Sequence, residues 1–209
     1  MDHSLNIEKT KENISNQKTA DNVINLSELK PTQGFAIKGI QDADSGIYGS
    51  VSEAGDVNGD GYQDIIIGAP DTAVNNKLRA GHVYVIFGHE NQTSSASLDV
   101  NNLDGSDGFV IEGLSKGYRL GESVSNAGDV NHDGIDDLLL GIPYAENNNQ
   151  ERSGKTYLLF GDSALGSSGT IDLSTLNNNS VVFQGGKKGS YLGISVSAAG
   201  DFNADGIDD

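Results

Sequence analysis

The chain contains no cysteine among its 209 residues, which excludes disulfide bonds and thiolate metal sites. The absence of cysteine does not by itself identify the compartment. Long apolar runs are missing too. Apolar runs such as those at residues 65–67 and 138–140 fall far short of the roughly 20 residues that a transmembrane helix needs. We therefore expect no direct insertion of this chain into a membrane.

Basic residues are scarce. The 13 Lys and Arg residues are outnumbered by 30 Asp and Glu residues, which gives a net charge of −17. Nucleic-acid phosphates need Lys and Arg to displace their counterions, so no nucleic-acid partner is expected. Eleven of the acids fall in three short Asp-rich loops, so much of the acidity belongs to the chemistry of those loops.

Catalytic motifs are also absent: the sequence has no G-x-S-x-G elbow, no H-E-x-x-H and no phosphate-binding P-loop. Of the four histidines, His132 fills a loop position and His82 opens an expected strand. We therefore expect this chain not to be an enzyme. Residues 1–23 are polar and lack the apolar core of a signal peptide, so they are expected to form a disordered N-terminal segment.

What the sequence does contain is a repeat. The segment 56–64 recurs at 129–137 and again at 201–209, at spacings of 73 and 72 residues. A fixed period of this kind predicts a repeat architecture. The expected units are residues 24–97, residues 98–170 and a truncated third copy at 171–209.

Each unit consists of short β-branched or aromatic segments bounded by Gly, Asn and Asp, which predicts strands. A run of small residues, such as 50–55, precedes each Asp loop and suits a crowded innermost strand. Segments such as 83–87 are apolar on both faces, as expected for a sheet packed between neighbours. Four antiparallel strands per unit predict an all-β fold of β-propeller blades, here an incomplete propeller of two full repeats and part of a third. An open β-solenoid or a β-sandwich array is the alternative.

The Asp loops predict cation sites. Each loop has Asp at positions 1, 5 and 9, Asn at position 3, a turn-forming Gly at position 6 and a backbone carbonyl available at position 7. Hard oxygen ligands in this number favour Ca²⁺, one per repeat and up to three in all, with an affinity of about 10⁻⁴–10⁻³ M. The candidate ligands are Asp56, Asn58, Asp60, Tyr62 and Asp64 in the first loop; Asp129, Asn131, Asp133, Ile135 and Asp137 in the second; and Asp201, Asn203, Asp205, Ile207 and Asp209 in the third.

An EF-hand is excluded because it needs a bidentate Glu at position 12, where this chain has Ile67 and Leu140 within expected strands. The alternative for a single copy is an Asp/Asn/Gly turn that binds nothing. Three copies that keep every ligand favour calcium. Without metal, the clustered carboxylates repel each other by roughly 1–4 kcal/mol per pair.

These features resemble the FG-GAP repeat of the integrin α-subunit β-propeller. The resemblance rests on the pairs Tyr48-Gly49, Leu120-Gly121 and Leu192-Gly193, the Ser-Val run, the Asp loop and Gly68-Ala69-Pro70. Tyr or Leu replaces the family Phe, and Ile142 replaces the family Ala. The resemblance implies a seven-bladed propeller with calcium loops on one face and partner recognition on the other. Similar repeats occur in bacterial surface proteins and in glycosylphosphatidylinositol-specific phospholipase D.

The expected function is therefore an extracellular or cell-surface adhesion module that binds a protein or glycan. Its recognition face is expected opposite the calcium loops, at loops 71–80, 144–153, 41–46 and 114–117. Lys77, Arg79, Glu151 and Arg152 form a candidate contact set there, and solvated loop tips are the alternative. Further blades in cis, or another copy of the chain, are expected to complete the propeller. Two other functions stay open: an accessory propeller of a secreted hydrolase, phospholipase D-like or polysaccharide-acting, and a calcium sensor.

Overall fold

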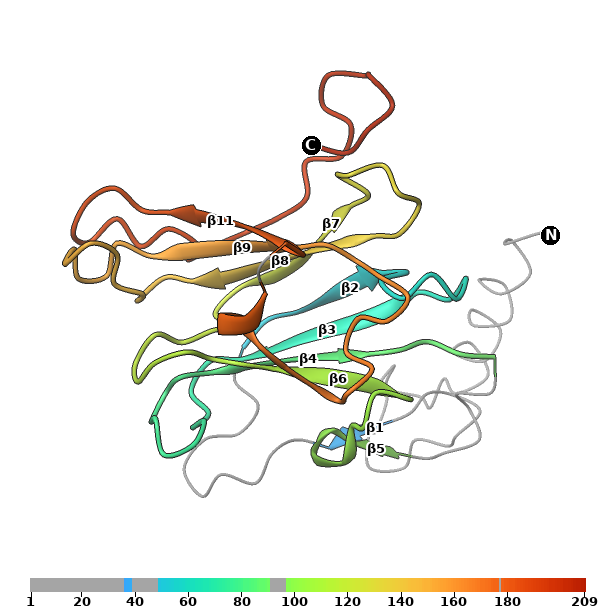
Figure 1. Cartoon of the computed structure of the whole chain (residues 1–209), viewed down its shortest axis with the longest axis horizontal. Helices are drawn as coiled ribbons and strands as arrows, with labels where there is room; N and C mark the ends of the chain where they lie inside the picture. The colour runs from blue at the N-terminus through green and yellow to red at the C-terminus, as the bar shows by residue number, and fades with distance from the viewer. Residues whose placement is uncertain (1–35, 39–48, 91–96, 177) are drawn as a thin grey trace, which may run out of the picture. The chain divides into compact units, whose positions relative to one another are not determined.

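The computed structural model describes residues 36–38, 49–90, 97–176 and 178–209 (Figure 1). The expected disordered segment 1–23 and the loop 41–46 lie outside the described residues. The chain divides into two units: a small one that includes residues 36–38 and 97–99, and a large one that holds the three Asp loops. Each unit is described by itself.

The first large sheet of the major unit is an antiparallel meander with one added strand. β2 (Val51–Gly55), β3 (Asp64–Ala69), β4 (His82–Ile86) and β6 (Gly108–Glu112) pair in this order. β10 (Thr170–Asp172) then pairs with β6 in parallel. The four antiparallel strands confirm the expected blade, whereas the parallel fifth strand was not expected from the sequence.

The second sheet repeats the meander with β7 (Val124–Gly128), β8 (Asp137–Ile142), β9 (Lys155–Leu159) and β11 (Ser180–Gln184). Both sheets have a register shift in the first strand next to the Asp loop. The two sheets are β-propeller blades, and together they form an incomplete, unclosed propeller. We call the sheet that begins with β2 blade 1 and the sheet that begins with β7 blade 2.

The blades are offset from the sequence repeats. β6 lies in the second repeat but completes blade 1, and β11 lies in the third repeat but completes blade 2. Between β9 and β11 the chain adds β10 to the outer edge of blade 1, just before the short 3₁₀ turn η4 (Leu173–Thr175). Each blade is therefore closed by residues of the following repeat, which ties consecutive repeats together.

The small unit shows the same pairing one repeat earlier. β1 (Ala36–Lys38) pairs in parallel with β5 (Ser97–Asp99), which leads into the 3₁₀ turn η3 (Val100–Asn102). Ile37 lies opposite Leu98, just as Ile111 lies opposite Ile171 in the β6–β10 pair. β1 thus has the sequence position of a fourth blade strand.

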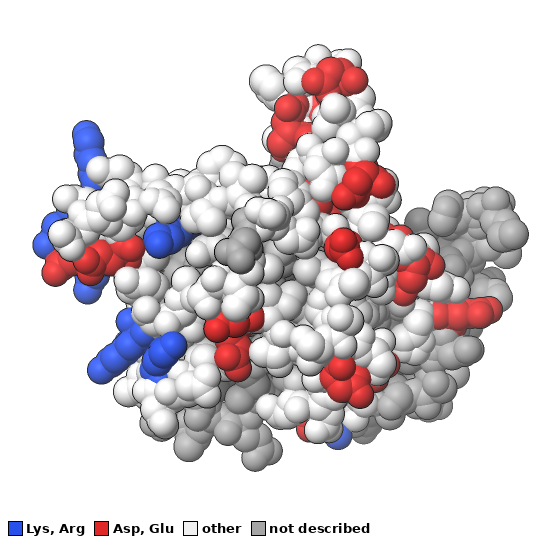
Figure 2. Space-filling model, in the orientation of Figure 1, with Lys and Arg blue, Asp and Glu red and all other residues white. Residues whose placement is uncertain are grey.

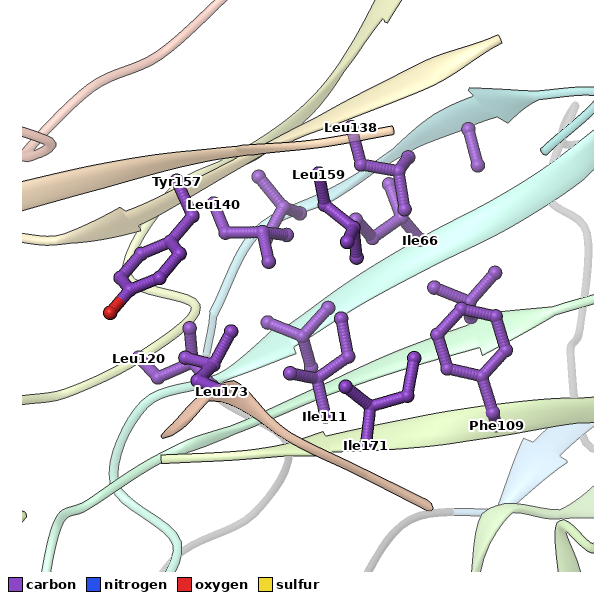
Figure 3. Close-up of a cluster of buried hydrophobic side chains, with 14 of the residues drawn as sticks. Ile66, Phe109, Ile111, Leu120, Leu138, Leu140, Tyr157, Leu159, Ile171 and Leu173 are labelled. Atoms are coloured by element: carbon purple, nitrogen blue, oxygen red, sulfur yellow. The ribbon is translucent and has the colours of Figure 1, made fainter. Parts of the chain in front are cut away.

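Apolar side chains fill the space between the two blades (Figure 3). Ile66 and Ile111 point into this cluster from blade 1, and Leu138, Leu140 and Leu159 come from blade 2. All five side chains are fully buried. Burial of side chains of this size contributes about 1.5–3 kcal/mol each, so the contact between blades is a principal source of stability.

Glycine-to-glycine contact brings the inner ends of the blades together. A Cβ atom on Gly68 would overlap the carbonyl oxygen of Gly121, and one on Gly141 would overlap that of Gly193. The amide of Gly68 also donates to the carbonyl of Ser50, at 2.7 Å. Backbones can approach this closely only where no side chain intervenes, which explains the Gly in each of these pairs.

Candidate metal centres

The first Asp loop connects β2 to β3 and folds its side chains back onto its own backbone. The amide of Asp60 donates both to Asp56 Oδ1 and to Asn58 Oδ1, each at 3.0 Å. The amide of Gly61 donates to Asp56 Oδ2 at 2.8 Å. The side-chain oxygens of positions 1 and 3 are therefore gathered around one amide group.

Positions 5 and 7 join the same turn. Asp60 Oδ1 accepts from the amide of Tyr62 at 2.9 Å, and Asp60 Oδ2 accepts from Asn58 Nδ2 at 3.0 Å. Gly61 has a φ of +90°, a conformation in which a side chain would be strained. The sequence prediction that Gly at position 6 makes the turn is confirmed.

The three loops share the same turn, although the Asn at position 3 donates to position 5 in the first two loops and to Asp209, at position 9, in the third. The four hydrogen bonds that position 1, position 3 and position 5 accept from backbone amides agree to within 0.1 Å among the loops. The loop at 201–209 forms this turn without a paired strand on either side of it among the described residues. The turn is therefore encoded locally by the Asp, Asn and Gly residues.

Position 9 is different, because its carboxylate is buried and bound by backbone amides. Asp64 Oδ2 accepts from the amide of Val57 at 3.0 Å, and Oδ1 accepts from the amide of Gly88, just past β4, at 2.8 Å. Burial raises the pKa of Asp64 to about 6; these hydrogen bonds oppose the shift, and the nearby Asp60 and Asp56 carboxylates add to it. The carboxylate at position 9 thus joins the loop to the chain just past β4, the third strand of the same blade.

Asp137 repeats this arrangement in blade 2, where it accepts from the amides of Val130 at 3.0 Å and Gly161 at 2.9 Å. Burial raises its pKa to about 6 as well. In the third loop Asp209 is exposed and accepts from the amide of Phe202 at 2.9 Å. The turn is therefore common to the three loops, whereas the buried position 9 belongs to the first two.

The donor chemistry of the loops suits a hard cation such as Ca²⁺. Each nine-residue loop offers three candidate-ligand carboxylates and one amide oxygen, and among the described residues none of these acids is paired with Lys or Arg. In the described part of the chain, no three Asp, Glu or His side chains already converge on one point as a metal would require. The fifteen ligand assignments therefore stay a prediction.

Two acids of the loops have a function that the sequence did not predict. Asp136 Oδ2 accepts from the amide of Asp56 at 2.8 Å, and the amide of Asp136 donates to the carbonyl of Asp56 at 3.1 Å. Asp208 Oδ2 accepts from the amide of Asp129 at 3.1 Å. Position 8 of one loop therefore binds position 1 of the preceding loop, which links successive blades beside the candidate cation sites.

We expect Asp136→Ala to destabilise the contact between the blades. The change leaves the half-buried amide of Asp56 without its acceptor, a loss of about 1–3 kcal/mol. Asp136→Asn keeps an acceptor oxygen and should cost less. Urea denaturation of each variant measures the free energy of unfolding.

Gln63→Ala is the matched control, because Gln63 is exposed at the same position of the first loop. It should change the free energy of unfolding by no more than about 0.5 kcal/mol. Equal stabilities for Asp136→Ala and Gln63→Ala would show that the link between the loops contributes nothing.

Outside the loops, His82 Nδ1 lies 2.7 Å from Thr72 Oγ1 and its ring stacks on Tyr84. These contacts hold the His82 ring in place at the start of β4, which indicates a structural role for this residue. No helix in the described part of the chain is long and apolar enough to cross a membrane.

Comparison with known proteins identifies the repeat. The FG-GAP repeat family model matches residues 48–86 and 120–159, which span the first three strands of blade 1 and of blade 2. The third Asp loop lies outside the matched ranges.

The chain is also similar to parts of much longer proteins. It is 33% identical over 106 residues to phosphatidylinositol-glycan-specific phospholipase D of Bos taurus, a match of 51% of this chain and 12% of the relative. It is 34% identical over 105 residues to integrin alpha-PS5 of Drosophila melanogaster, covering 48% of this chain and 9% of the relative. Integrin alpha-3 of Mus musculus is 32% identical over 111 residues, again with 9% of the relative covered. The matches thus span about a tenth of the length of these relatives. With the blade fold and the recurring Asp loops, they show that the chain contains FG-GAP repeats of the integrin-α-like kind.

Proposed function

We propose that this chain is a calcium-binding propeller module, with one Ca²⁺ held by each Asp loop through the fifteen residues predicted above. The observation that carries the proposal is the turn shared by all three loops, which gathers the side-chain oxygens of positions 1 and 3 around the amide of position 5. Bound Ca²⁺ would supply the positive charge that these acidic loops lack. The ion would then stiffen each hairpin and the contact between blades at Asp136.

Calorimetric titration of the metal-free chain with Ca²⁺, and separately with Mg²⁺, tests the proposal. We expect saturable Ca²⁺ binding and weaker Mg²⁺ binding, because Mg²⁺ demands near-ideal octahedral geometry and keeps several of its waters. Equal affinities for the two ions would argue against a calcium-selective loop. No binding of either ion would reject the proposed sites.

The module is proposed to act in adhesion or in binding a protein or glycan, at the cell surface or outside the cell. The integrin relatives support this proposal. So does the separation of charge in the major unit, where acids cluster at the Asp loops and basic side chains gather at the other end (Figure 2). The end with basic side chains, which includes Arg79 and Arg152, is where the sequence analysis predicts the recognition face, and we propose that partners bind there.

The outer strand of blade 2 indicates a second kind of partner. Val181 and Phe183 of β11 are 42% and 49% exposed, whereas Phe109 and Ile111, at the matching positions of β6, are fully buried. In blade 1 these positions are part of the core cluster that blade 2 covers. A further propeller blade, in cis or from another copy of the chain, would cover β11 in the same way.

Sedimentation velocity tests whether another copy of the chain covers the exposed face of β11. We expect the chain to associate as its concentration rises, because β11 presents an apolar face. Phe183→Lys should weaken this association, whereas Leu78→Lys, at an apolar residue that is 60% exposed in the β3–β4 loop, should not. A monomeric chain unaffected by Phe183→Lys would contradict the proposal that another copy covers this face.

An accessory propeller of a secreted hydrolase is the second candidate, favoured by the phospholipase D relatives. In that case the catalytic part lies outside these 209 residues. The complete reading frame of the gene distinguishes the candidates: a hydrolase domain in frame supports the second, and additional FG-GAP repeats alone support the first.

A further inference from the structure

The basic residues of the major unit share one end of the blades. All eight Lys and Arg residues of the described segments from residue 49 onward lie at the end opposite the Asp loops (Figure 2). They are Lys77, Arg79, Lys116, Arg119, Arg152, Lys155, Lys187 and Lys188. Among the described residues six acids share this end, namely Asp71, Glu112, Glu122, Glu146, Glu151 and Asp172, which leaves it a net charge of +2 (eight minus six) in a chain whose total is −17. An anionic ligand would be attracted to this end and repelled by the other.

An open pocket of about 450 Å³ lies at this end, between the β8–β9 loop and the loops that follow β6 and β11. Its volume is that of a site for a small ligand. Tyr118, Tyr144 and Tyr191 contribute to the wall, and the rings of Tyr144 and Tyr191 meet edge to face at 5.6 Å. The guanidinium groups of Arg119 and Arg152 lie 5.3 and 5.9 Å from the centre of the Tyr144 ring.

Some charges at the pocket are already neutralised. Lys188 Nζ pairs with Glu151 Oε2 at 2.6 Å. Arg119, beside the pocket, pairs with Asp71 at 3.3 Å and with Glu122 at 3.0 Å. Neither group needs a ligand to balance its charge.

Three charged side chains of the pocket keep their charge unbalanced. Arg152 and Lys116 are exposed, and within the described residues neither forms an ion pair; Arg152 Nη1 instead lies 3.5 Å from the hydroxyl of Tyr191. Glu146 is likewise exposed and forms no ion pair with a described residue. The pocket thus offers two cationic groups and one carboxylate acceptor.

Blade 1 shows which of these features the fold itself requires. Arg79 and Arg152 occupy the same place in the two blades, each with a φ of +54° and each accepting a backbone hydrogen bond at 3.1 Å on its carbonyl oxygen. The side chains around them differ: Asp71 stands where blade 2 has Tyr144, and Ala73 stands where it has Glu146. Because blade 1 builds the same backbone without Tyr144 and Glu146, the fold does not require these two residues.

We propose that this pocket binds an acidic sugar residue, a hexuronate unit of a saccharide, which extends the binding function proposed above. Its carboxylate matches the guanidinium of Arg152 and the ammonium of Lys116. Its hydroxyl groups can donate to Glu146 and exchange hydrogen bonds with the tyrosine hydroxyls. A bare inorganic anion would leave Glu146 without a donor, and an extended acidic peptide would reach beyond so compact a pocket.

The probe is digalacturonic acid, and its dimethyl ester is the matched ligand, because it keeps the shape and hydroxyl groups but loses the charge. Amide chemical shifts of the full chain, recorded with and without Ca²⁺, measure the affinity and locate the site. We expect the acid to shift residues of the pocket and to bind at least tenfold more tightly than the ester. Arg152→Gln should weaken binding of the acid by about tenfold, the loss of one charge-assisted contact of about 1.4 kcal/mol.

Arg79→Gln is the matched variant, since Arg79 has the same backbone conformation but lies outside the pocket lining. It should change the affinity less than twofold, and both variants should keep the melting temperature of the parent chain. Equal binding of acid and ester, equal losses in the two Arg variants, or tighter binding of a hexa-aspartate peptide would overturn the proposal. Uronate binding without any Ca²⁺ binding would leave this inference standing and reject the proposed calcium sites, whereas Ca²⁺ binding without uronate binding would do the reverse.

Discussion

Replacing Gly68 by alanine is expected to unfold the contact between the two blades. The added Cβ would overlap the carbonyl oxygen of Gly121, a backbone atom rather than a flexible side chain. The segment around it is fixed by hydrogen bonds from the amide of Leu120 to the carbonyl of Ala80 and from the amide of Gly121 to the carbonyl of Gly141. Relief would require the innermost strands to move apart, which would open the buried cluster around Ile66 and Leu138. We expect a loss of about 3–5 kcal/mol, a large share of the 5–15 kcal/mol that stabilises an ordinary domain.

Gly186→Ala is the control for this variant. Gly186 has no atom within 4 Å of the position where its Cβ would stand, and its φ is not positive. Chemical denaturation of both variants should therefore show a large loss of free energy for Gly68→Ala and almost none for Gly186→Ala. Similar stabilities would mean that the glycine contacts do not set the spacing of the blades.

Removal of calcium is expected to have the second largest effect. At a free Ca²⁺ concentration ten times its dissociation constant, each site stabilises the folded state by about 1.4 kcal/mol. Three independent sites would contribute about 4 kcal/mol. For a domain of this size, the loss corresponds to a fall of about 10 °C in melting temperature.

Thermal unfolding in excess EDTA and in excess Ca²⁺ measures this difference. Readdition of Ca²⁺ should restore the melting temperature, whereas the same concentration of Mg²⁺ should restore less of it. A melting curve that EDTA leaves unchanged would contradict a stabilising role for the cation.

The features that recur in the sequence were predictable, because a period makes each copy a check on the others. The loop residues Asp56 and Gly61, the strands on either side and the close packing of the innermost strand all follow from local chemistry repeated at a fixed interval. The structure confirms the antiparallel order of these strands and places the Asp loops where the sequence predicts them.

Features that depend on a neighbouring blade were not predictable in the same way. Asp136 is recognisable as one of the loop acids, but its partner, the amide of Asp56, lies 80 residues earlier in another blade. β10 is only three residues long with a single apolar position, Ile171, so it carried no signal for parallel pairing with β6. Tyr144 does not recur in blade 1, and its contribution to a pocket appears only when three loops meet.

The number of calcium ions bound per chain tests the central claim most directly. Native mass spectrometry of the parent chain and of three single variants, Asp60→Asn, Asp133→Asn and Asp205→Asn, counts the ions while the fold of each variant is checked by circular dichroism. Asn removes one carboxylate charge yet keeps an oxygen that can accept the hydrogen bond now donated by the residue at position 7. The account predicts three ions for the parent chain and one fewer in each variant. A parent chain that binds no Ca²⁺, or variants that bind as many ions as the parent, would contradict it.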